Sequence, residues 1–264
     1  MKVLGREIKV ILFDLDDTLY RCHELNQSVV QGIQGFMVRH LGFKPEEVAA
    51  KATELYVKYG TTMAGLVEQG HIINFDQWHK EVHWGHIKYN ELLYSDPALR
   101  DILMSLGDET PRHVFTNADK EHARICLDKL GIADCFQVVH HFESLNEAAA
   151  LQQSTTDSTP PKQHIVCKPS QEAYELLFRL LDVEAKHVLF FDDSIRNIRA
   201  AHSLGVMTVL VGSDQAVEGA DLVMPDLHHI PSMLKLQDEC LLKVQPQDSG
   251  VLAAEAEEMV VVTA

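Results

Sequence analysis

Several features that define membrane-spanning or secreted proteins are missing from this sequence of 264 residues. It has no run of about 18 apolar residues, the length that crosses a bilayer as a helix. Its first residues, MKVLGREIKVILF, lack a signal-peptide pattern, because the apolar run leads directly to Asp14. The five cysteines include no C-x-x-C pair and are scattered: Cys22, Cys126, Cys135, Cys167 and Cys240. These absences predict a cytoplasmic protein with reduced thiols.

Basic charge is also scarce. The sequence has 23 Lys and Arg residues against 39 Asp and Glu residues, which gives a net charge of −16. Such a chain is repelled by nucleic acids and by anionic membranes, so we expect neither as a partner. Apolar residues make up 46% of the chain, which is enough for a sizeable core. We therefore expect a small-molecule substrate, and the oligomeric state stays open.

Acidic groups are concentrated in the stretch ILFDLDDTLY, residues 11–20. The apolar run 10–13 predicts a buried strand, and Asp14, Asp16 and Asp17 follow it at once. Like charges this close raise each other's pKa and cost free energy unless a cation or a basic side chain compensates them. The stretch therefore predicts a site for such a partner at the end of a strand.

The periodicity of the remaining sequence predicts an α/β fold. Strands alternate with helices after residue 96, which favours a parallel sheet with helices on both faces. We expect strands at 113–115, 136–139, 187–191, 206–211 and 222–224, and helices at 98–106, 119–130, 170–181 and 196–204. Residues 1–20 and 96–240 are thus predicted to form a Rossmann-like, doubly wound parallel sheet.

Residues 21–95 show helical spacing throughout and no convincing strand. They predict an inserted all-helical domain with helices near 24–41, 45–59, 62–69 and 76–89. We expect residues 143–163 to form a loop, which includes the polar, proline-containing stretch QQSTTDSTPPK. The tail, residues 241–264, is acidic and then apolar, and both a disordered and a docked tail stay open.

Further polar residues follow the other predicted strands. Thr116 and Asn117 end one strand, Asp192 and Asp193 end another, and Lys168 precedes a helix. Sites in open α/β sheets form at the carboxyl ends of strands. Carboxylates, a hydroxyl and an ammonium group at one edge suit phosphoryl transfer, in which a carboxylate attacks phosphorus, a second carboxylate moves protons, and Mg²⁺ screens the charges.

These motifs resemble the four motifs of the haloacid dehalogenase (HAD) superfamily, in the family's order. They are D-x-D-x-T at residues 14–18, VFTN with Thr116, CKP with Lys168, and FFDDS with Asp192 and Asp193. The helical insertion at 21–95 lies where C1 caps of this superfamily are inserted. The resemblance thus covers residues 10–20 and 96–230.

The resemblance implies a role for each matching residue. Asp14 would be the nucleophile and Asp16 the general acid and base, and a carboxylate at position 16 favours a phosphatase over a dehalogenase. The resemblance further implies substrate-binding and metal-binding sets: Thr116, Asn117 and Lys168 for the phosphoryl group; Asp14, the backbone carbonyl of Asp16, and Asp193 for Mg²⁺, with Asp192 acting through a water molecule.

Within the superfamily, three stretches are similar to the pyrimidine 5′-nucleotidase branch, which has plant and fungal members. They are FDLDDTLY, YGTTMAGL (residues 59–66) and FTNAD (residues 115–119). This similarity implies nucleoside 5′-monophosphates as substrates, with the preferred base open. We expect substrate contacts from Tyr59, Thr61 and Thr62 in the cap, and from Arg21 at the entry to it.

Several alternatives stay open beside this interpretation. The substrate could be another small phosphomonoester, such as a sugar phosphate or lysophosphatidate, or the chain could be a non-catalytic phosphoryl-binding protein. A receiver domain is disfavoured, because receivers lack both an acid two residues after the acceptor and a helical insertion. Asp17 is expected to face away from the site. His79, His83 and His86 have helical spacing, and packing, contact with base or ribose, and metal binding all stay open for them, although no H-E-x-x-H motif occurs.

Overall fold

The computed structural model describes residues 1–153 and 163–235. Its centre is a sheet of six parallel strands in the order β5-β4-β3-β6-β7-β8. The strands are β3 (Val10–Phe13), β4 (Arg112–Phe115), β5 (Val138–His140), β6 (Val188–Asp192), β7 (Met207–Val211) and β8 (Leu222–Met224). A separate antiparallel pair, β1 (Lys2–Val3) and β2 (Arg6–Glu7), was not anticipated by the periodicity.

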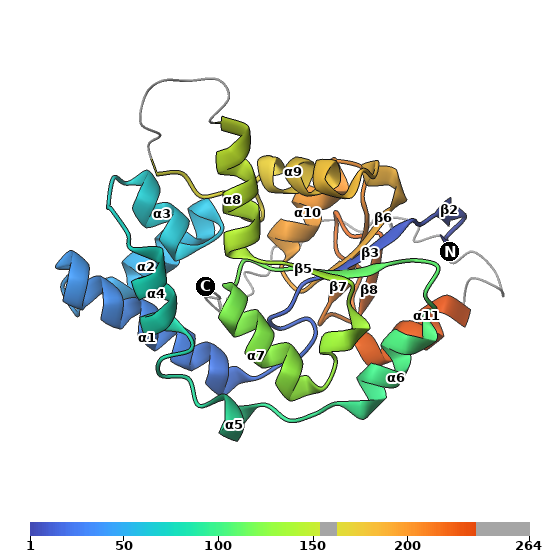
Figure 1. Cartoon of the computed structure of the whole chain (residues 1–264), viewed down its shortest axis with the longest axis horizontal. Coiled ribbons are helices and arrows are strands. Elements are labelled where there is room, and N and C mark those ends of the chain that lie inside the picture. The colour runs from blue at the N-terminus through green and yellow to red at the C-terminus, as the bar shows by residue number, and fades with distance from the viewer. Residues whose placement is uncertain (154–162, 236–264) are drawn as a thin grey trace, which may run out of the picture.

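Helices cover both faces of the sheet (Figure 1). Val10 and Leu12 of β3 belong to one apolar cluster, and Ile11 and Phe13 belong to the other, because successive side chains of a strand point to opposite faces. The first cluster lies under α8 (Phe142–Gln153), α9 (Gln171–Leu181) and α10 (Ile195–Ser203), and the second under α6 (Pro97–Ser105), α7 (Lys120–Leu130) and α11 (Ile230–Lys235). The predicted fold class, a doubly wound parallel sheet, is confirmed.

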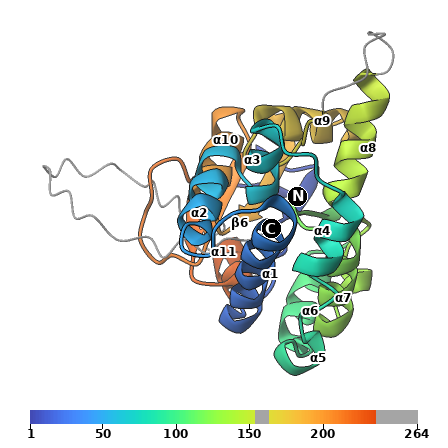
Figure 2. The same ribbon diagram turned by 90° about the vertical axis from the view of Figure 1, so that its left-hand side faces the viewer.

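The chain between β3 and α6 is helical, as the spacing predicts. It forms α1 (His23–Leu41), α2 (Val48–Tyr59), α3 (Thr62–Glu68), α4 (Phe75–Val82) and α5 (Tyr89–Leu92), and Figure 2 shows the group of α1 to α4 facing the viewer. Gly42 ends α1 in the left-handed conformation (φ 73°), which glycine adopts without steric cost. All of residues 21–95 are described and contain no strand, while the domain limits at 20 and 96 remain a prediction.

The expected helix at 76–89 is wrong in its second half. Helix α4 ends at Val82, and His83 takes a non-helical conformation (φ −112°, ψ −98°). A tight turn follows, in which the amide of Gly85 donates to the carbonyl of Lys80 (2.8 Å). His86 therefore does not continue the helical face that carries His79.

The expected loop at 143–163 is also wrong in its first half, because α8 extends to Gln153. Its sequence, FESLNEAAALQQ, is rich in good helix formers. The rest of that predicted loop, residues 154–162, and the tail, residues 241–264, lie outside the described residues, as does the end of the predicted core at 236–240.

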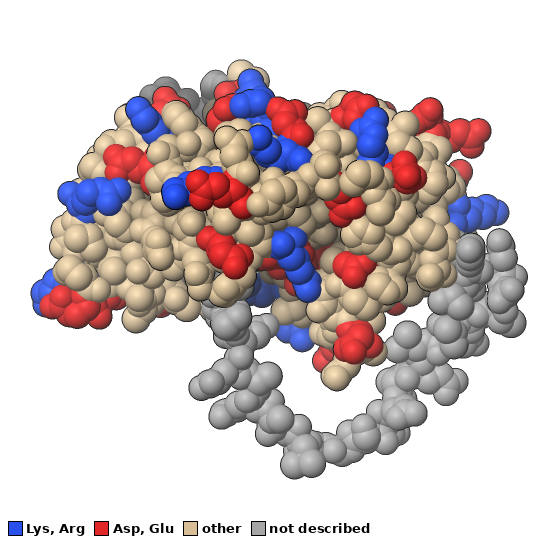
Figure 3. Space-filling model, turned by 90° about the horizontal axis from the view of Figure 1, so that it is seen from below, with Lys and Arg blue, Asp and Glu red and all other residues tan. Residues whose placement is uncertain are grey.

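Two further features of the structure are its surface charge and the lengths of its helices. Acidic and basic side chains are interspersed on the face seen in Figure 3. Among the described residues, no helix is both long enough and apolar enough to cross a membrane.

Candidate active site

Three neighbouring strands bring the predicted motifs to one edge of the sheet. Phe13 of β3 pairs with Val114 of β4 and with Phe191 of β6, so the residues after these strands end up side by side. The amide of Asp14 donates to the carbonyl of Phe191 (2.8 Å), which holds the start of the acidic loop against β6. Strand β3 lies between β4 and β6. The chain runs from β3 to β4 and β5 on one side and then crosses to β6 on the other side, so the strand order reverses at β3, which is where sites form in such folds.

Lys168 joins the carboxylates of two strands. Its Nζ lies 2.6 Å from Oδ1 of Asp14 and 2.7 Å from Oδ2 of Asp192, and its side chain is 1% exposed. Its backbone is fixed by Asn117, whose amide side chain accepts from the Lys168 amide (2.9 Å) and donates to the Lys168 carbonyl (3.0 Å). The ammonium group thus compensates buried carboxylates that would otherwise repel each other.

One ammonium group is not enough for the acidic charge at this edge. Burial raises the pKa of Asp14 to about 8. The negative charges of Asp192 and Asp16 add to this effect, and the positive charge of Lys168 opposes it. Burial and the charges of Asp192 and Asp14 also hold the pKa of Asp193 well above its usual range. The protein without a further cation therefore disfavours simultaneous ionisation of Asp14 and Asp193.

Asp14, Asp192 and Asp193 together fit a hard divalent cation. Oxygen atoms of Asp14, Asp192 and Asp193 all lie within 4.8 Å of one another. Asp192 is already engaged, because it accepts from Lys168, from the amide of Ser194 (2.8 Å) and from Asn197 (3.0 Å). Within the described part of the chain, no donor is bonded to the carboxylate of Asp193. An oxygen-only donor set of this kind is what Mg²⁺ prefers.

Asp16 lies beside this cluster but has different partners. His122 on α7 donates from Nε2 to Oδ1 of Asp16 (2.9 Å), and the hydroxyl of Tyr20 donates to the same oxygen. Burial alone would raise the pKa of Asp16, but the charge and hydrogen bond of His122 and the hydrogen bond of Tyr20 outweigh it, so the pKa is lowered. The sequence did not identify His122 and Tyr20, because no local pattern shows which side chains of a helix or loop contact the carboxylate of Asp16.

The third aspartate of the loop turns to the helical insertion. Both carboxylate oxygens of Asp17 accept from Nδ2 of Asn26 on α1 (2.9 and 2.7 Å). Asp17 has a positive φ of 57°, a conformation that aspartate tolerates better than most residues. It is absent from the residues that line the cavity over Asp14.

The cavity over Asp14 is small, about 20 Å³, which is little more than one water molecule needs. The predicted residues that line it are Asp14, Asp16, Thr116, Asn117, Lys168 and Asp193, and those that sequence reasoning missed are Tyr56, Gly60, Ser194, Arg196 and Asn197. A phosphate ester enters only when this cavity widens. Tyr56 and Gly60 belong to the insertion, so movement of the insertion against the sheet domain would widen the cavity.

Four predicted substrate-binding residues lie outside this lining. Thr61 caps α3 by accepting from the amide of Ala64 (3.0 Å), and Thr62 donates to the carbonyl of Ala52 on α2 (3.1 Å). Tyr59 is half-buried at the end of α2. Arg21 lines a separate cavity of about 390 Å³. Contact of these four residues with substrate stays a prediction.

Arg196 fastens the insertion to the sheet domain directly above the cavity. Its guanidinium group lies 4.2 Å from the centre of the Tyr56 ring. Its Nη1 donates to the carbonyl oxygens of Tyr56 (2.8 Å) and Val57 (3.0 Å). The only local signal for this residue was its position just after the D-D-S stretch, at the start of a predicted helix.

Comparison with known proteins agrees with this geometry. Residues 8–205 match the family model described as haloacid dehalogenase-like hydrolase. Phosphate metabolism protein 8 of Saccharomyces cerevisiae is 27% identical to the chain over 228 residues, which are 83% of this chain and 66% of that protein. The chain therefore spans just under two thirds of that relative's length.

Solved structures share the fold at low identity. The HAD phosphatase from Thermococcus onnurineus has a TM-score of 0.54 and 18% identity, over 86% of this chain and 98% of that one. The L-2-haloacid dehalogenase from Xanthobacter autotrophicus has a TM-score of 0.52 and 18% identity, over the same shares. One fold thus serves two reactions, and the side chains have to distinguish them.

Proposed function

Because this chain belongs to the haloacid dehalogenase-like hydrolase family, we propose that it is a Mg²⁺-dependent phosphatase of nucleoside 5′-monophosphates. The observation that carries the proposal is the buried contact of Lys168 with Asp14 and Asp192, with Asp193 beside them. A carboxylate at position 16 gives the site a group that can protonate a leaving alkoxide, which the release of a halide does not need.

The first half of the proposed reaction transfers the phosphoryl group to the protein. Lys168 holds Oδ1 of Asp14, while no donor among the described residues is bonded to Oδ2, which is therefore the attacking oxygen. Oδ2 forms a bond to phosphorus as the bond from phosphorus to the ester oxygen breaks. The imidazolium of His122, which is hydrogen-bonded to Asp16, passes a proton through the Asp16 carboxylate to that oxygen, and the nucleoside leaves.

The second half returns the protein to its starting state. The Asp16 carboxylate takes a proton from a water molecule, which attacks the phosphorus of the aspartyl-phosphate. The bond between phosphorus and Asp14 breaks, and inorganic phosphate leaves. Thr116, Asn117 and Lys168 hold the phosphoryl oxygens. Asp14, Asp193 and the backbone carbonyl of Asp16 would hold a Mg²⁺ ion, with Asp192 acting through water, and the ion would supply the positive charge that phosphoryl transfer needs.

The substrate class rests on the similarity of residues 59–66 and 115–119 to the pyrimidine 5′-nucleotidase branch. The name of the yeast relative, which refers to phosphate metabolism, supports phosphate chemistry and leaves the ester open. We place the activity in the cytoplasm, acting on a small molecule and not on nucleic acid or a membrane. The four described cysteines are free thiols, which agrees with that compartment.

A panel of phosphate esters tests the proposal. Phosphate release is measured with Mg²⁺ from UMP, CMP, GMP, AMP, XMP, IMP, glucose 6-phosphate, glycerol 3-phosphate and lysophosphatidate. One nucleotide far ahead of the others supports the proposal and identifies the base. A sugar phosphate or lysophosphatidate ahead of every nucleotide keeps the chemistry and overturns the substrate class.

The same assay tests the nucleophile. Asp14→Asn is expected to lower turnover more than about 1000-fold, since the proposed reaction forms its covalent bond to phosphorus through the Asp14 carboxylate. Asp17→Asn is the matched control, because it changes an aspartate of the same loop that faces Asn26. Retained activity in Asp14→Asn overturns the mechanism.

A further inference from the structure

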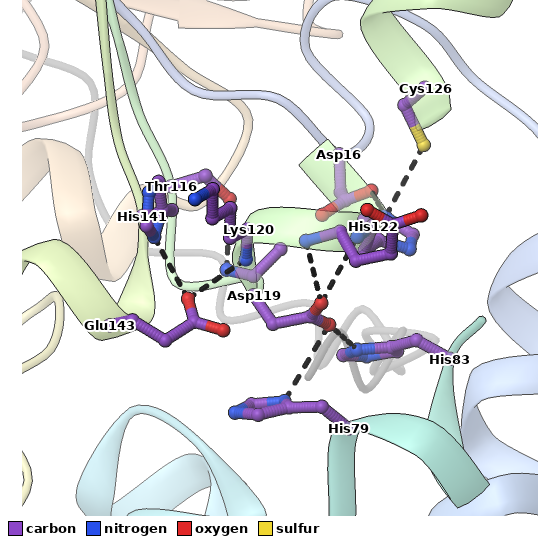
Figure 4. A network of polar contacts seen from close by, with 12 residues as sticks. Asp16, His79, His83, Thr116, Asp119, Lys120, His122, Cys126, His141 and Glu143 are labelled. Atoms are coloured by element: carbon purple, nitrogen blue, oxygen red, sulfur yellow. Dashed lines mark hydrogen bonds and ion pairs between the residues drawn. The ribbon is translucent and has the colours of Figure 1, made fainter. Parts of the chain in front are cut away.

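Helix α4 of the insertion meets the start of helix α7 through a buried group of three side chains (Figure 4). His79 lies on α4, His83 directly follows its last residue, and Asp119 is the residue that caps α7. The side chains of all three are between 1% and 5% exposed. Their ligand atoms lie within 4.8 Å of one another, outside the cavity that holds Asp14.

His79 lacks the partners that a buried imidazole needs. Neither of its ring nitrogens has a hydrogen-bond partner among the described residues, and Nδ1 lies 3.6 Å from Oδ2 of Asp119. Burial lowers the pKa of His79 to about 4. The charge of Asp119 opposes this effect, and the charge of His83 adds to it. Both ring nitrogens of His79 are thus buried without a hydrogen-bond partner among the described residues, which costs free energy unless something is bound there.

The two carboxylate oxygens of Asp119 have different partners. Oδ1 accepts from the amides of Glu121 and His122, both at 3.0 Å, and so caps α7. Oδ2 faces the Nδ1 atoms of His79 and His83, the second of which is hydrogen-bonded to it. The cap fixes the carboxylate, and this fixed carboxylate directs its second oxygen to both imidazoles.

We propose that His79, His83 and Asp119 bind a divalent transition-metal ion of the zinc class, which joins the helical insertion to the sheet domain. Two imidazole nitrogens and one carboxylate oxygen form a donor set that such ions prefer, and water completes a tetrahedral site. On binding, the proton shared by His83 and Asp119 leaves to solvent, and the ion replaces it.

The donor atoms distinguish this site from the catalytic one. The cluster of Asp14, Asp192 and Asp193 offers oxygen alone and suits Mg²⁺, whereas the histidine site offers nitrogen. The proposal does not depend on the proposed reaction, because it rests on different residues. A bound ion would link α4 to α7 and oppose the movement that widens the cavity over Asp14.

Metal uptake by the full chain, expressed without a histidine tag, tests the proposal. The protein carries Asp14→Asn and Asp193→Asn, which remove oxygen ligands of the catalytic site, and is stripped with a chelator. Co²⁺ is then added in excess Mg²⁺, and its visible absorption reports coordination. We expect one equivalent bound with the intense absorption of a tetrahedral ion, displaced by Zn²⁺. Weak six-coordinate absorption, or no uptake, overturns the proposal and leaves a cluster that shares protons.

Single substitutions in that background locate the ion. His79→Gln is expected to weaken Co²⁺ binding more than about tenfold, whereas His86→Gln, which changes an exposed histidine of the same segment, leaves it unchanged. If His79→Gln fails to fold, Asp119→Asn replaces it, because asparagine keeps the oxygen that caps α7. Equal binding by the ligand variants and the control overturns the assignment to these residues.

Discussion

Nε2 of His122 lies 2.9 Å from Oδ1 of Asp16, although 106 positions of sequence separate the two residues. Nδ1 of the same ring lies 2.8 Å from the hydroxyl of Tyr89, so both ring nitrogens have partners. Burial of His122 would lower its pKa, but the charges of Cys126 and Asp16 outweigh burial, so the pKa of His122 is raised. His122 therefore positions the carboxylate that our mechanism uses for proton transfer.

Replacement of His122 by Gln is expected to slow the first half-reaction. General acid catalysis contributes about 100- to 10,000-fold, and loss of its positioning should cost about 10- to 100-fold of that. The measured quantity is leaving-group release in the first turnover. The loss should be larger for a nucleoside monophosphate than for p-nitrophenyl phosphate, whose phenolate needs less protonation. Tyr89→Phe should show a smaller loss of the same kind, and equal losses for both substrates would contradict a role in proton transfer.

Asp193 should determine the affinity for Mg²⁺. Its carboxylate is not bonded to any donor within residues 1–153 and 163–235, and it lies beside Asp14 and Asp192. We expect Asp193→Asn to raise the Mg²⁺ concentration that gives half-maximal activity by about tenfold or more. Asp17→Asn should leave that concentration unchanged, and a similar shift in both variants would argue against Asp193 as a ligand.

Lys168 should support stability as well as activity. Removal of one partner from a buried ion pair costs about 3–5 kcal/mol, because the remaining charge is left uncompensated. Lys168→Met should therefore lower the free energy of unfolding by about 3 kcal/mol or more, measured by urea denaturation without Mg²⁺. Lys186→Met removes an exposed partner of Glu184 and should cost less than about 1 kcal/mol. Equal costs would mean that the Lys168 contacts add no net stability.

Arg196 should matter for the fit between the insertion and the sheet domain. Arg196→Ala removes the stacking on Tyr56 and two hydrogen bonds to backbone carbonyls, so we expect kcat/KM to fall by about tenfold. Arg196→Lys should recover only part of this loss, since an ammonium group does not stack as a planar guanidinium does. Arg199→Ala, on the outer side of the same helix α10, serves as the control. Full activity in Arg196→Ala would show that this contact is dispensable.

His140 on β5 predicts a loss of stability in mild acid. It is buried, with Nε2 3.1 Å from Nδ1 of His113, and burial together with the charges of His113 and His141 lowers its pKa to about 4. Between pH 6.5 and 4 the unfolded state binds a proton at this residue that the folded state does not bind. The contribution of His140 is therefore complete above pH 6.5 and is lost as the pH falls towards 4, by about 2–3 kcal/mol. Urea denaturation of the native chain and of His140→Gln should show a shallower decline in the variant, and parallel curves would contradict the assignment.

The elements and the core motifs could be predicted from local signals. The apolar run before Asp14 predicts a buried strand, and residues such as Gly42 and Ser170 mark helix ends through the conformation or the hydrogen bond of one residue. In a parallel sheet the carboxyl ends of strands must share an edge, so Thr116 and Asp192 were expected beside Asp14. The helix expected at 76–89 was wrong in its second half. It ends at Val82, and His83, the next residue, contacts Asp119 on another helix, which helical spacing does not reveal.

The sequence by itself thus determined the parallel sheet, the helical insertion and the acidic edge, because strand period, helix period and turn residues act within a few positions of the chain. Only the tertiary structure decided that His122 holds Asp16, that Arg196 holds Tyr56, and that His79 and His83 converge on Asp119. Those contacts depend on the angles and offsets at which helices pack against the sheet. These angles follow from the summed packing of many side chains and not from any local pattern.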